Sequence, residues 1–194
     1  MVDVINEMQT EECPSMKAAL TSDTFWHLCA MAYLCSMYNY FLNAVWKKFF
    51  PTLFEVKDSD LALLLSIGAF SNSIFRVLIG FLLVKVHFKY IFLANAVTAT
   101  ISSWTVNHLA KSYPIGIIYI ILEFGGFGTN SSLLPNICLK VFGSTYGPRV
   151  YPCVYLMFSF ASLTQYLVLK LAGPEPNWLY LCRLLGTVTF TGFL

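Results

Sequence analysis

Two charged side chains stand inside long apolar stretches of this 194-residue chain, and their positions make them the first candidates for chemistry. Arg76 interrupts the otherwise uncharged residues 61–84, and Glu123 is the only acid within residues 115–139. An ionised group inside a segment long enough to cross a bilayer costs several kcal/mol unless it faces protein, water or a counter-charge. Arg76 and Glu123 therefore mark candidate functional sites.

The elements that must position these residues are apolar segments of about 20 residues, which predict transmembrane helices. Hydrophobic residues make up 57% of the chain and charged residues 11%. A membrane β-barrel is excluded, because its strands alternate over about ten residues whereas these segments are apolar on both faces. We predict an all-α integral membrane bundle, residues 24–194, behind a polar leader at 1–23, with six helices at 24–46, 61–84, 90–109, 115–139, 150–172 and 178–194.

One of these helices carries strong helix-bending residues. The segment 115–139 contains Pro135 together with Gly125, Gly126 and Gly128. Proline removes a helical hydrogen bond and glycine weakens a helix, so we expect this helix to be the one that is bent or broken.

The charge distribution excludes some partners and leaves the orientation open. The net charge is +2 and the 12 lysines and arginines are scattered, so we expect no nucleic-acid partner. The leader is mainly acidic, whereas a signal peptide or mitochondrial presequence begins basic, and we expect neither. Basic residues are equally numerous on the two sides of a six-span arrangement, so the positive-inside rule assigns no orientation.

Polar and small residues recur every fourth position around Arg76. Gly68, Asn72, Arg76 and Gly80 therefore share one helix face. Glycines let helix backbones approach each other, and polar groups avoid lipid. This pattern predicts a face that contacts protein or water, with close helix packing at both ends.

Partners for the buried charges are limited. Glu123 is a candidate to pair with Arg183 or with Arg76, either as a structural ion pair that locks the bundle or as part of a transport pathway. Tyr38 and Asn39 in the first predicted helix either line a cavity or fill a helix interface. Both alternatives stay open for each group.

Enzymatic chemistry is not indicated. No arrangement of Ser/His/Asp, paired carboxylates or Cys/His stands out, and the three histidines lack metal-ligand spacing. We expect a protein that is not an enzyme and that uses no metal and no cofactor.

The segment AFSNSIFRVLIG around Arg76 resembles the eighth transmembrane helix of major facilitator superfamily carriers of the monocarboxylate transporter and oxalate/formate antiporter-like type. In those carriers an acid and an arginine four residues later form the substrate and proton site. Arg76 falls on the arginine, and Asn72 stands where the acid belongs. The loop motif that follows matches at Gly80, Lys85 and Lys89, with Val84 in place of its aspartate.

Two further segments extend this resemblance to nearly the whole chain. PNICLKVFG, residues 135–143, is similar to the junction after the tenth helix of such carriers, and SMKAALTSDTFWHL, residues 15–28, resembles the central loop entering the seventh. The resemblance is to the second six-helix half of a twelve-helix protein. It implies that Arg76 binds a small carboxylate, that proton coupling at Asn72 is lost, and that both termini face the cytosol or the mitochondrial matrix.

Two functions follow from the resemblance. The chain is either a transporter-derived accessory subunit that packs against other membrane proteins and has lost transport, or one half of a monocarboxylate carrier completed by a dimer or by a second six-helix half. The expected surroundings are a lipid bilayer, with the mitochondrial inner membrane and the plasma membrane as the candidate locations.

Overall fold

The computed structural model describes residues 15–53, 55, 57–109, 112–173 and 176–192, and these form helices joined by short turns, with no strand among them. The all-helical prediction is confirmed. Most of the predicted leader, residues 1–14, lies outside the described residues. Its last part forms the short helix α2 (Met16–Thr21), where the Ser15 hydroxyl accepts a hydrogen bond from the Ala18 backbone N–H at 3.1 Å.

The first predicted helix is interrupted. Residues 24–46 are covered by α3 (Asp23–Cys35) and α4 (Met37–Phe49), which meet at Ser36. The Ser36 hydroxyl donates to the Ala32 and Tyr33 carbonyls at 2.7 and 3.0 Å, a side-chain bond that competes with the helical ladder and bends helices. A 3-10 turn, η1 (Phe50–Thr52), ends this part of the chain.

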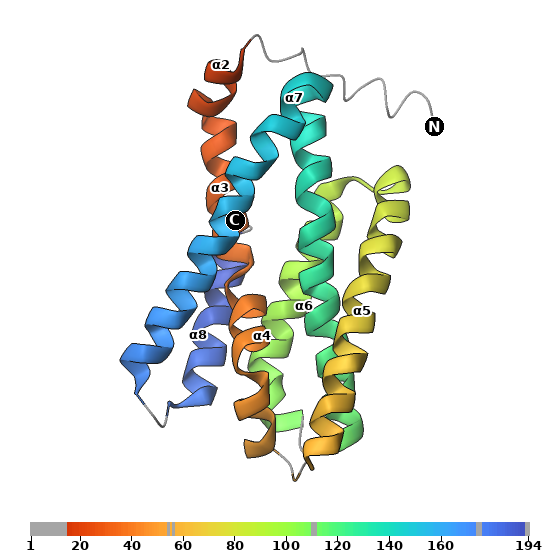
Figure 1. Ribbon diagram of the computed structural model, residues 1–194, viewed down its shortest axis with the longest axis vertical. Coiled ribbons are helices and arrows are strands. Elements are labelled where there is room, and N and C mark those ends of the chain that lie inside the picture. Colours follow the sequence, from red (N-terminus) through yellow and green to blue (C-terminus); the bar gives the residue numbers. More distant parts are fainter. Residues whose placement is uncertain (1–14, 54, 56, 110–111, 174–175, 193–194) are drawn as a thin grey trace.

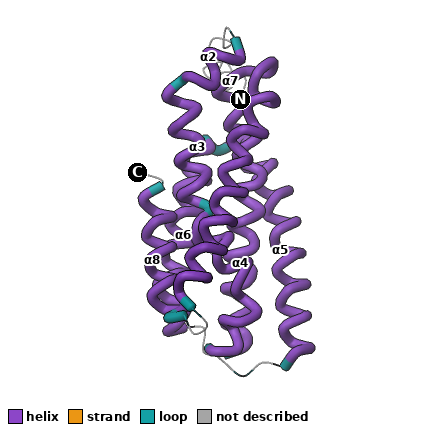
Figure 2. The backbone as a smooth tube through the Cα atoms, turned by 60° about the vertical axis from the view of Figure 1, so that its left-hand side comes forward, coloured by secondary structure: helices purple, strands orange, loops and turns teal. Residues whose placement is uncertain are grey.

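Three further helices lie where apolar segments predict them. They are α5 (Asp58–Lys85), α6 (Phe88–Leu109) and α8 (Trp178–Thr191). The side chain of Asn177 caps α8 by accepting a hydrogen bond from the Tyr180 N–H at 3.1 Å. In both views of the backbone α5 stands at one edge of the bundle (Figures 1 and 2).

The longest element, α7 (Tyr113–Ala172), consists of two helical arms, 113–142 and 144–172, joined at Gly143. Gly143 has φ 78° and ψ 176°, a conformation that residues with a side chain rarely adopt. The chain turns back at this point (Figure 1). The two arms contain the predicted helices at 115–139 and 150–172. The helix predicted at 115–139 is not broken at Pro135 or the preceding glycines, because helical backbone continues through them to residue 142.

The arms of α7 pack against α2, α3, α4, α5 and α6. The first arm lies along α5, and α6 pairs with α8 on the other side (Figure 2). One apolar cluster surrounds the buried face of α4, including Phe41 and Phe49, and a second surrounds the corner of α7, including Leu133 and Val154. α4 therefore lies in the interior and α5 at the rim.

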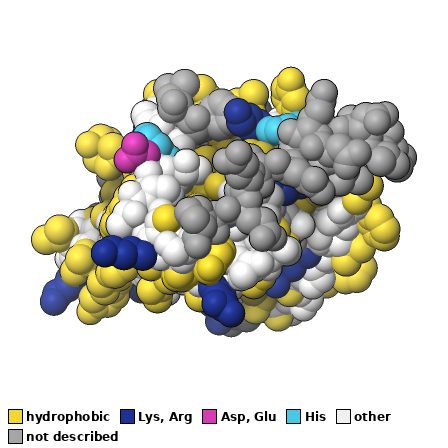
Figure 3. Space-filling model, turned by 90° about the horizontal axis from the view of Figure 1, so that it is seen from above, with side chains coloured by type: hydrophobic (Ala, Val, Ile, Leu, Met, Phe, Trp, Pro, Cys, Tyr) yellow, Lys and Arg dark blue, Asp and Glu magenta, His cyan; other side chains and the backbone are white. Residues whose placement is uncertain are grey.

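The surface of the bundle is strongly apolar. On α5, Phe70 and Phe81 are 69% and 71% exposed, and hydrophobic side chains cover much of the rim in the end-on view, with a few Lys and Arg side chains between them (Figure 3). Within the described residues two helices are long and apolar enough to cross a membrane by length and composition, Ser59–Lys85 and Tyr113–Ala172. Only 22% of the most apolar 18-residue stretch of each of these two helices is buried, whereas the core helix of a soluble protein is mostly buried.

Candidate functional site

The backbone around Arg76 is fixed by close contact between α5 and the first arm of α7. Gly128 lies directly against the carbonyl of Asn72. The Ser71 hydroxyl donates to the Ile121 carbonyl at 2.7 Å, and the Ser132 hydroxyl donates to the Arg76 carbonyl at 3.3 Å. The two bonds follow each other in the same order along both helices, so α5 and the first arm of α7 run parallel. They fix the position of the Arg76 backbone relative to α7.

The side chain of Arg76 is exposed. It lies close enough to Tyr40 on α4 and Tyr151 on the second arm of α7 to interact with both electrostatically. Apart from Glu123, the acids among the described residues stand at helix ends or in turns. The described groups with which the guanidinium interacts electrostatically are therefore phenols.

Ring contacts link these tyrosines into an aromatic strip that joins α4 to both arms of α7. Tyr40 packs edge-on against Phe127 with ring centroids 4.9 Å apart and lies 5.5 Å from Phe158. Tyr155 is 5.1 Å from Phe158 and 5.6 Å from Tyr151. Such contacts contribute about 0.5–1.5 kcal/mol each beyond the area that they bury. The strip holds the tyrosines in place relative to one another.

This surface, formed by Asn72, Arg76, Tyr40 and Tyr151, is called the Arg76 face below. A guanidinium presents several N–H donors in a planar fork that matches a carboxylate, and phenol hydroxyls add further donors. Asn72 is an amide and does not ionise near neutral pH. The Arg76 face is therefore suited to hold an anionic group but offers no proton-exchanging acid at Asn72.

Tyr38 and Asn39 lie elsewhere. The structure buries them inside the bundle, with exposed fractions of 0% and 3%, whereas Tyr40 is the α4 residue near Arg76. Tyr38 and Tyr40 are two residues apart and so point in nearly opposite directions around a helix. The sequence shows the cluster of tyrosines but carries no signal for which of them faces Arg76.

Glu123 is also buried, at 4% exposure, and pairs with neither candidate arginine. Arg183 instead meets His108, with Nη2 and Nε2 3.0 Å apart, and its guanidinium lies 5.3 Å from the centre of the Trp104 ring. The Ser102 side chain is beside the Glu123 carboxyl, yet neither carboxyl oxygen has a well-formed hydrogen bond within the described residues. The predicted ion pairs are therefore replaced by two separate sites.

The residues of the loop motif lie at the C-terminal end of α5 and at the start of α6. Lys85 is the last residue of α5 and Lys89 the second of α6, and both are exposed. Gly80 has no neighbouring atom within 4 Å of the place where a Cβ would stand. Close helix packing, expected at both Gly68 and Gly80, therefore occurs only at Gly68, which lies against the Phe124 ring.

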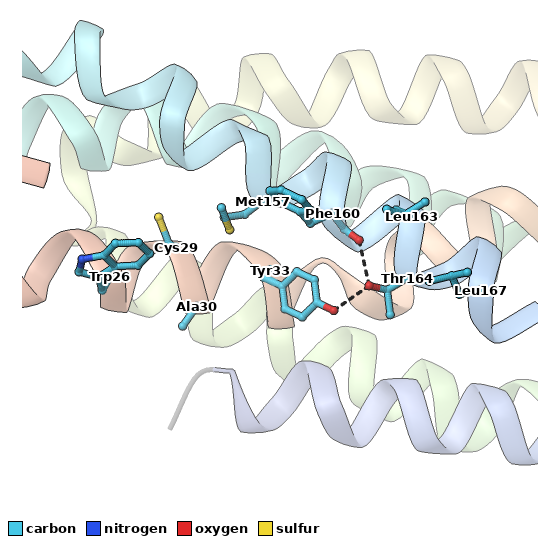
Figure 4. Close-up of a pocket in the computed structure, with 9 residues that line it drawn as sticks. All are labelled: Trp26, Cys29, Ala30, Tyr33, Met157, Phe160, Leu163, Thr164 and Leu167. Atoms are coloured by element: carbon cyan, nitrogen blue, oxygen red, sulfur yellow. Dashed lines mark hydrogen bonds between the residues drawn. The ribbon is translucent and has the colours of Figure 1, made fainter.

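An apolar groove of about 530 Å³ opens between α3 and the second arm of α7 (Figure 4). Two hydrogen bonds join its lining residues: the Tyr33 and Thr164 hydroxyls lie 2.7 Å apart, and the Thr164 hydroxyl donates to the Phe160 carbonyl at 2.9 Å. These groups satisfy each other, so the groove offers little polar recognition. Its lining comprises Trp26, Cys29, Ala30, Tyr33, Met157, Phe160, Leu163, Thr164 and Leu167.

No group of three or more histidine, cysteine, aspartate or glutamate side chains comes together as a metal site in the part of the chain that the structure describes. No family model matches the chain, and no curated protein matches it significantly. Interpretation of the site therefore depends on its geometry.

Proposed function

We propose that this chain is a multi-pass integral membrane protein that acts as an accessory or structural subunit of a larger membrane complex. The observation that carries the proposal is the exposed guanidinium of Arg76 on a helix whose other outward residues include Phe70 and Phe81. A charge at that depth is stable only against water, a polar partner or a counter-charge. A partner protein that covers the Arg76 face supplies that environment.

The membrane location is supported by the surface as well as by the sequence. Large apolar side chains cover the outside of α5 and of the second arm of α7, among them Val77, Phe81, Phe160 and Leu171. Contiguous exposed apolar side chains on a protein in water cause aggregation or mark an interface. In a bilayer they contact lipid, and helices satisfy their own backbone hydrogen bonds there.

We further propose that the chain derives from a major facilitator-type carrier and has lost transport. The corner of α7 at Gly143 coincides with the last residue of the PNICLKVFG segment, which resembles an interhelical junction of such carriers. Asn72 and Val84 stand where the resemblance calls for acids. An amide at position 72 neither binds nor releases a proton near neutral pH.

A second function is favoured by one observation, the approach of Arg76 to Tyr40 and Tyr151 from three different elements. This arrangement suits a small carboxylate held by charge-assisted hydrogen bonds. In that alternative the chain is half of a monocarboxylate carrier, and a second copy or a separate half forms the other wall of the cavity.

The mass and composition of the native particle after gentle detergent extraction separate the two functions. A native gel followed by mass spectrometry of the co-migrating proteins is the measurement. Fixed stoichiometry within a much larger complex supports the accessory role. Recovery as a dimer, or with one other six-helix protein, supports the carrier, and carboxylate uptake into vesicles made from that particle is then the deciding assay.

A further inference from the structure

A group of buried polar atoms without hydrogen-bond partners lies in the middle of the bundle. Within the described residues it includes both carboxyl oxygens of Glu123 and the hydroxyl of Tyr38, with exposed fractions of 4% and 0%. Buried polar groups are almost always hydrogen-bonded, and an unsatisfied one costs about 1–3 kcal/mol. Such a group calls for a ligand, a water molecule or a change of charge state.

Each neighbouring element presents an uncharged or weakly acidic group to Glu123. Ser102 comes from α6, Tyr38 from α4 and Cys182 from α8, and the latter two lie within electrostatic reach of the carboxyl. One turn before Glu123, Tyr119 already donates its hydroxyl to Thr105 at 2.7 Å. None of these groups carries a positive charge that balances a carboxylate.

The nearby arginines are engaged elsewhere. Arg183 follows Cys182 on α8, but its Nη2 contacts His108 and its guanidinium lies over the Trp104 ring, while its buried Nε has no hydrogen-bond partner among the described residues. Arg76 interacts with Tyr40, which projects to the other side of α4 from Tyr38. On α5, the Ser71 hydroxyl donates its hydrogen bond to the Ile121 carbonyl. An ionised Glu123 lacks compensation from every described element around it, and isolated buried charges neutralise instead.

We propose that Glu123 is a proton-binding site, with a neutral carboxyl group in the folded protein at neutral pH. A carboxylic acid keeps one O–H donor and a carbonyl acceptor, so the Ser102 and Tyr38 hydroxyls match both. When the proton leaves, the neighbouring groups that can donate to the carboxylate are uncharged, and none of them balances its charge. This inference does not depend on whether the chain is an accessory subunit or half of a carrier.

A group of amide side chains lies about one turn from Glu123. Asn39, next to Tyr38, lies with Asn95 beside Gly126, one turn from Glu123. Asn95 donates to the Asn130 side chain at 2.8 Å and also lines a cavity of about 330 Å³ between α5, α6 and α7. Both polar atoms of the Asn39 amide lack partners among the described residues. Asn95 therefore connects this cavity to the amide groups beside Gly126.

Infrared difference spectroscopy of the purified protein in detergent tests the assignment. Spectra of the wild type and Glu123→Gln at neutral pH should differ by the carbonyl stretch of a protonated carboxyl, and this band should shift in D₂O. Glu55→Gln, which changes an exposed acid in a turn, should leave the band unchanged. Thermal unfolding of each variant shows that the compared proteins are folded.

Three results overturn the proposal. If the spectra of the folded wild type and of Glu123→Gln show no difference in the protonated-carboxyl band, Glu123 is ionised. If sodium ions at neutral pH raise the unfolding temperature of the wild type but not of Glu123→Gln, the site holds a cation rather than a proton. Because Gln imitates a neutral carboxyl group, Glu123→Gln should unfold within a few degrees of the wild type, and a large loss of stability also counts against a neutral Glu123.

Discussion

Gly128 lies so close to Asn72 that a Cβ atom at position 128 would overlap the Asn72 carbonyl. This contact is between backbones, and a backbone cannot move aside as a flexible side chain does. It places the first arm of α7 directly against α5, one turn before Arg76. The position of the Arg76 face therefore depends on the absence of a side chain at residue 128.

Gly128→Ala should separate the two helices and destabilise the protein by about 1–3 kcal/mol, the usual effect of overpacking. Thermal unfolding in detergent measures this change. Gly80→Ala is the matched control on α5, because nothing lies within 4 Å of the added methyl group, and it should cause no loss. Equal unfolding temperatures for the two variants would show that the helices are not in contact at Asn72.

Gly143→Ala should also destabilise the protein, but through backbone strain rather than packing. The φ of 78° and ψ of 176° at Gly143 belong to a region that costs other residues on the order of 1–3 kcal/mol. The neighbouring Ser144 is exposed and helical, so Ser144→Ala should be neutral. Chemical denaturation followed by circular dichroism distinguishes the two, and an unaffected Gly143→Ala would place the corner elsewhere.

The same position shows what the sequence predicts and what it does not. Apolar length predicts the helices, because a helix satisfies its own backbone wherever it lies. The location of the corner does not follow from composition. Pro135 is tolerated inside a continuous helix, whereas Gly143 breaks the helix through a positive φ. The other glycines within α7 do not adopt a positive φ.

The candidate site was predictable in part for a similar reason. Arg76 and Glu123 stand out because charges are rare in apolar segments. Their neighbours do not stand out, since helices that are apolar on all sides carry no periodic signal for which face is turned inward. The burial of Tyr38, the exposure of Gly80 and the pairing of Arg183 with His108 all depend on helix rotation and tertiary contact.

Tyr33→Phe should weaken the contact between α3 and the second arm of α7. It removes the 2.7 Å hydrogen bond to Thr164 at the edge of the apolar groove (Figure 4), a loss of about 1 kcal/mol. Tyr166→Phe removes a hydroxyl from a tyrosine on the same arm that is 60% exposed, and it should have little effect. Unfolding temperatures compare the pair, and a larger effect for Tyr166→Phe would contradict the groove geometry.

Arg76→Gln should release the chain from its native complex while leaving its own fold intact. The Arg76 side chain is exposed, and the backbone carbonyl of residue 76 still accepts the hydrogen bond from Ser132 in the variant. Removal of the charge therefore breaks no contact in the core of the bundle. Arg149→Gln is the control, because Arg149 is an exposed arginine near the corner of α7 with only a 6.0 Å ring contact to Tyr146.

The measurement is the fraction of tagged chain that co-migrates with the complex on a native gel, together with the unfolding temperature of the purified chain. We expect Arg76→Gln to lose most of the co-migrating fraction and Arg76→Lys to keep part of it, because lysine retains the charge but not the planar fork of donors. Arg149→Gln should behave as the wild type. Full assembly of Arg76→Gln, combined with loss of carboxylate uptake, would instead assign Arg76 to substrate and support the carrier function.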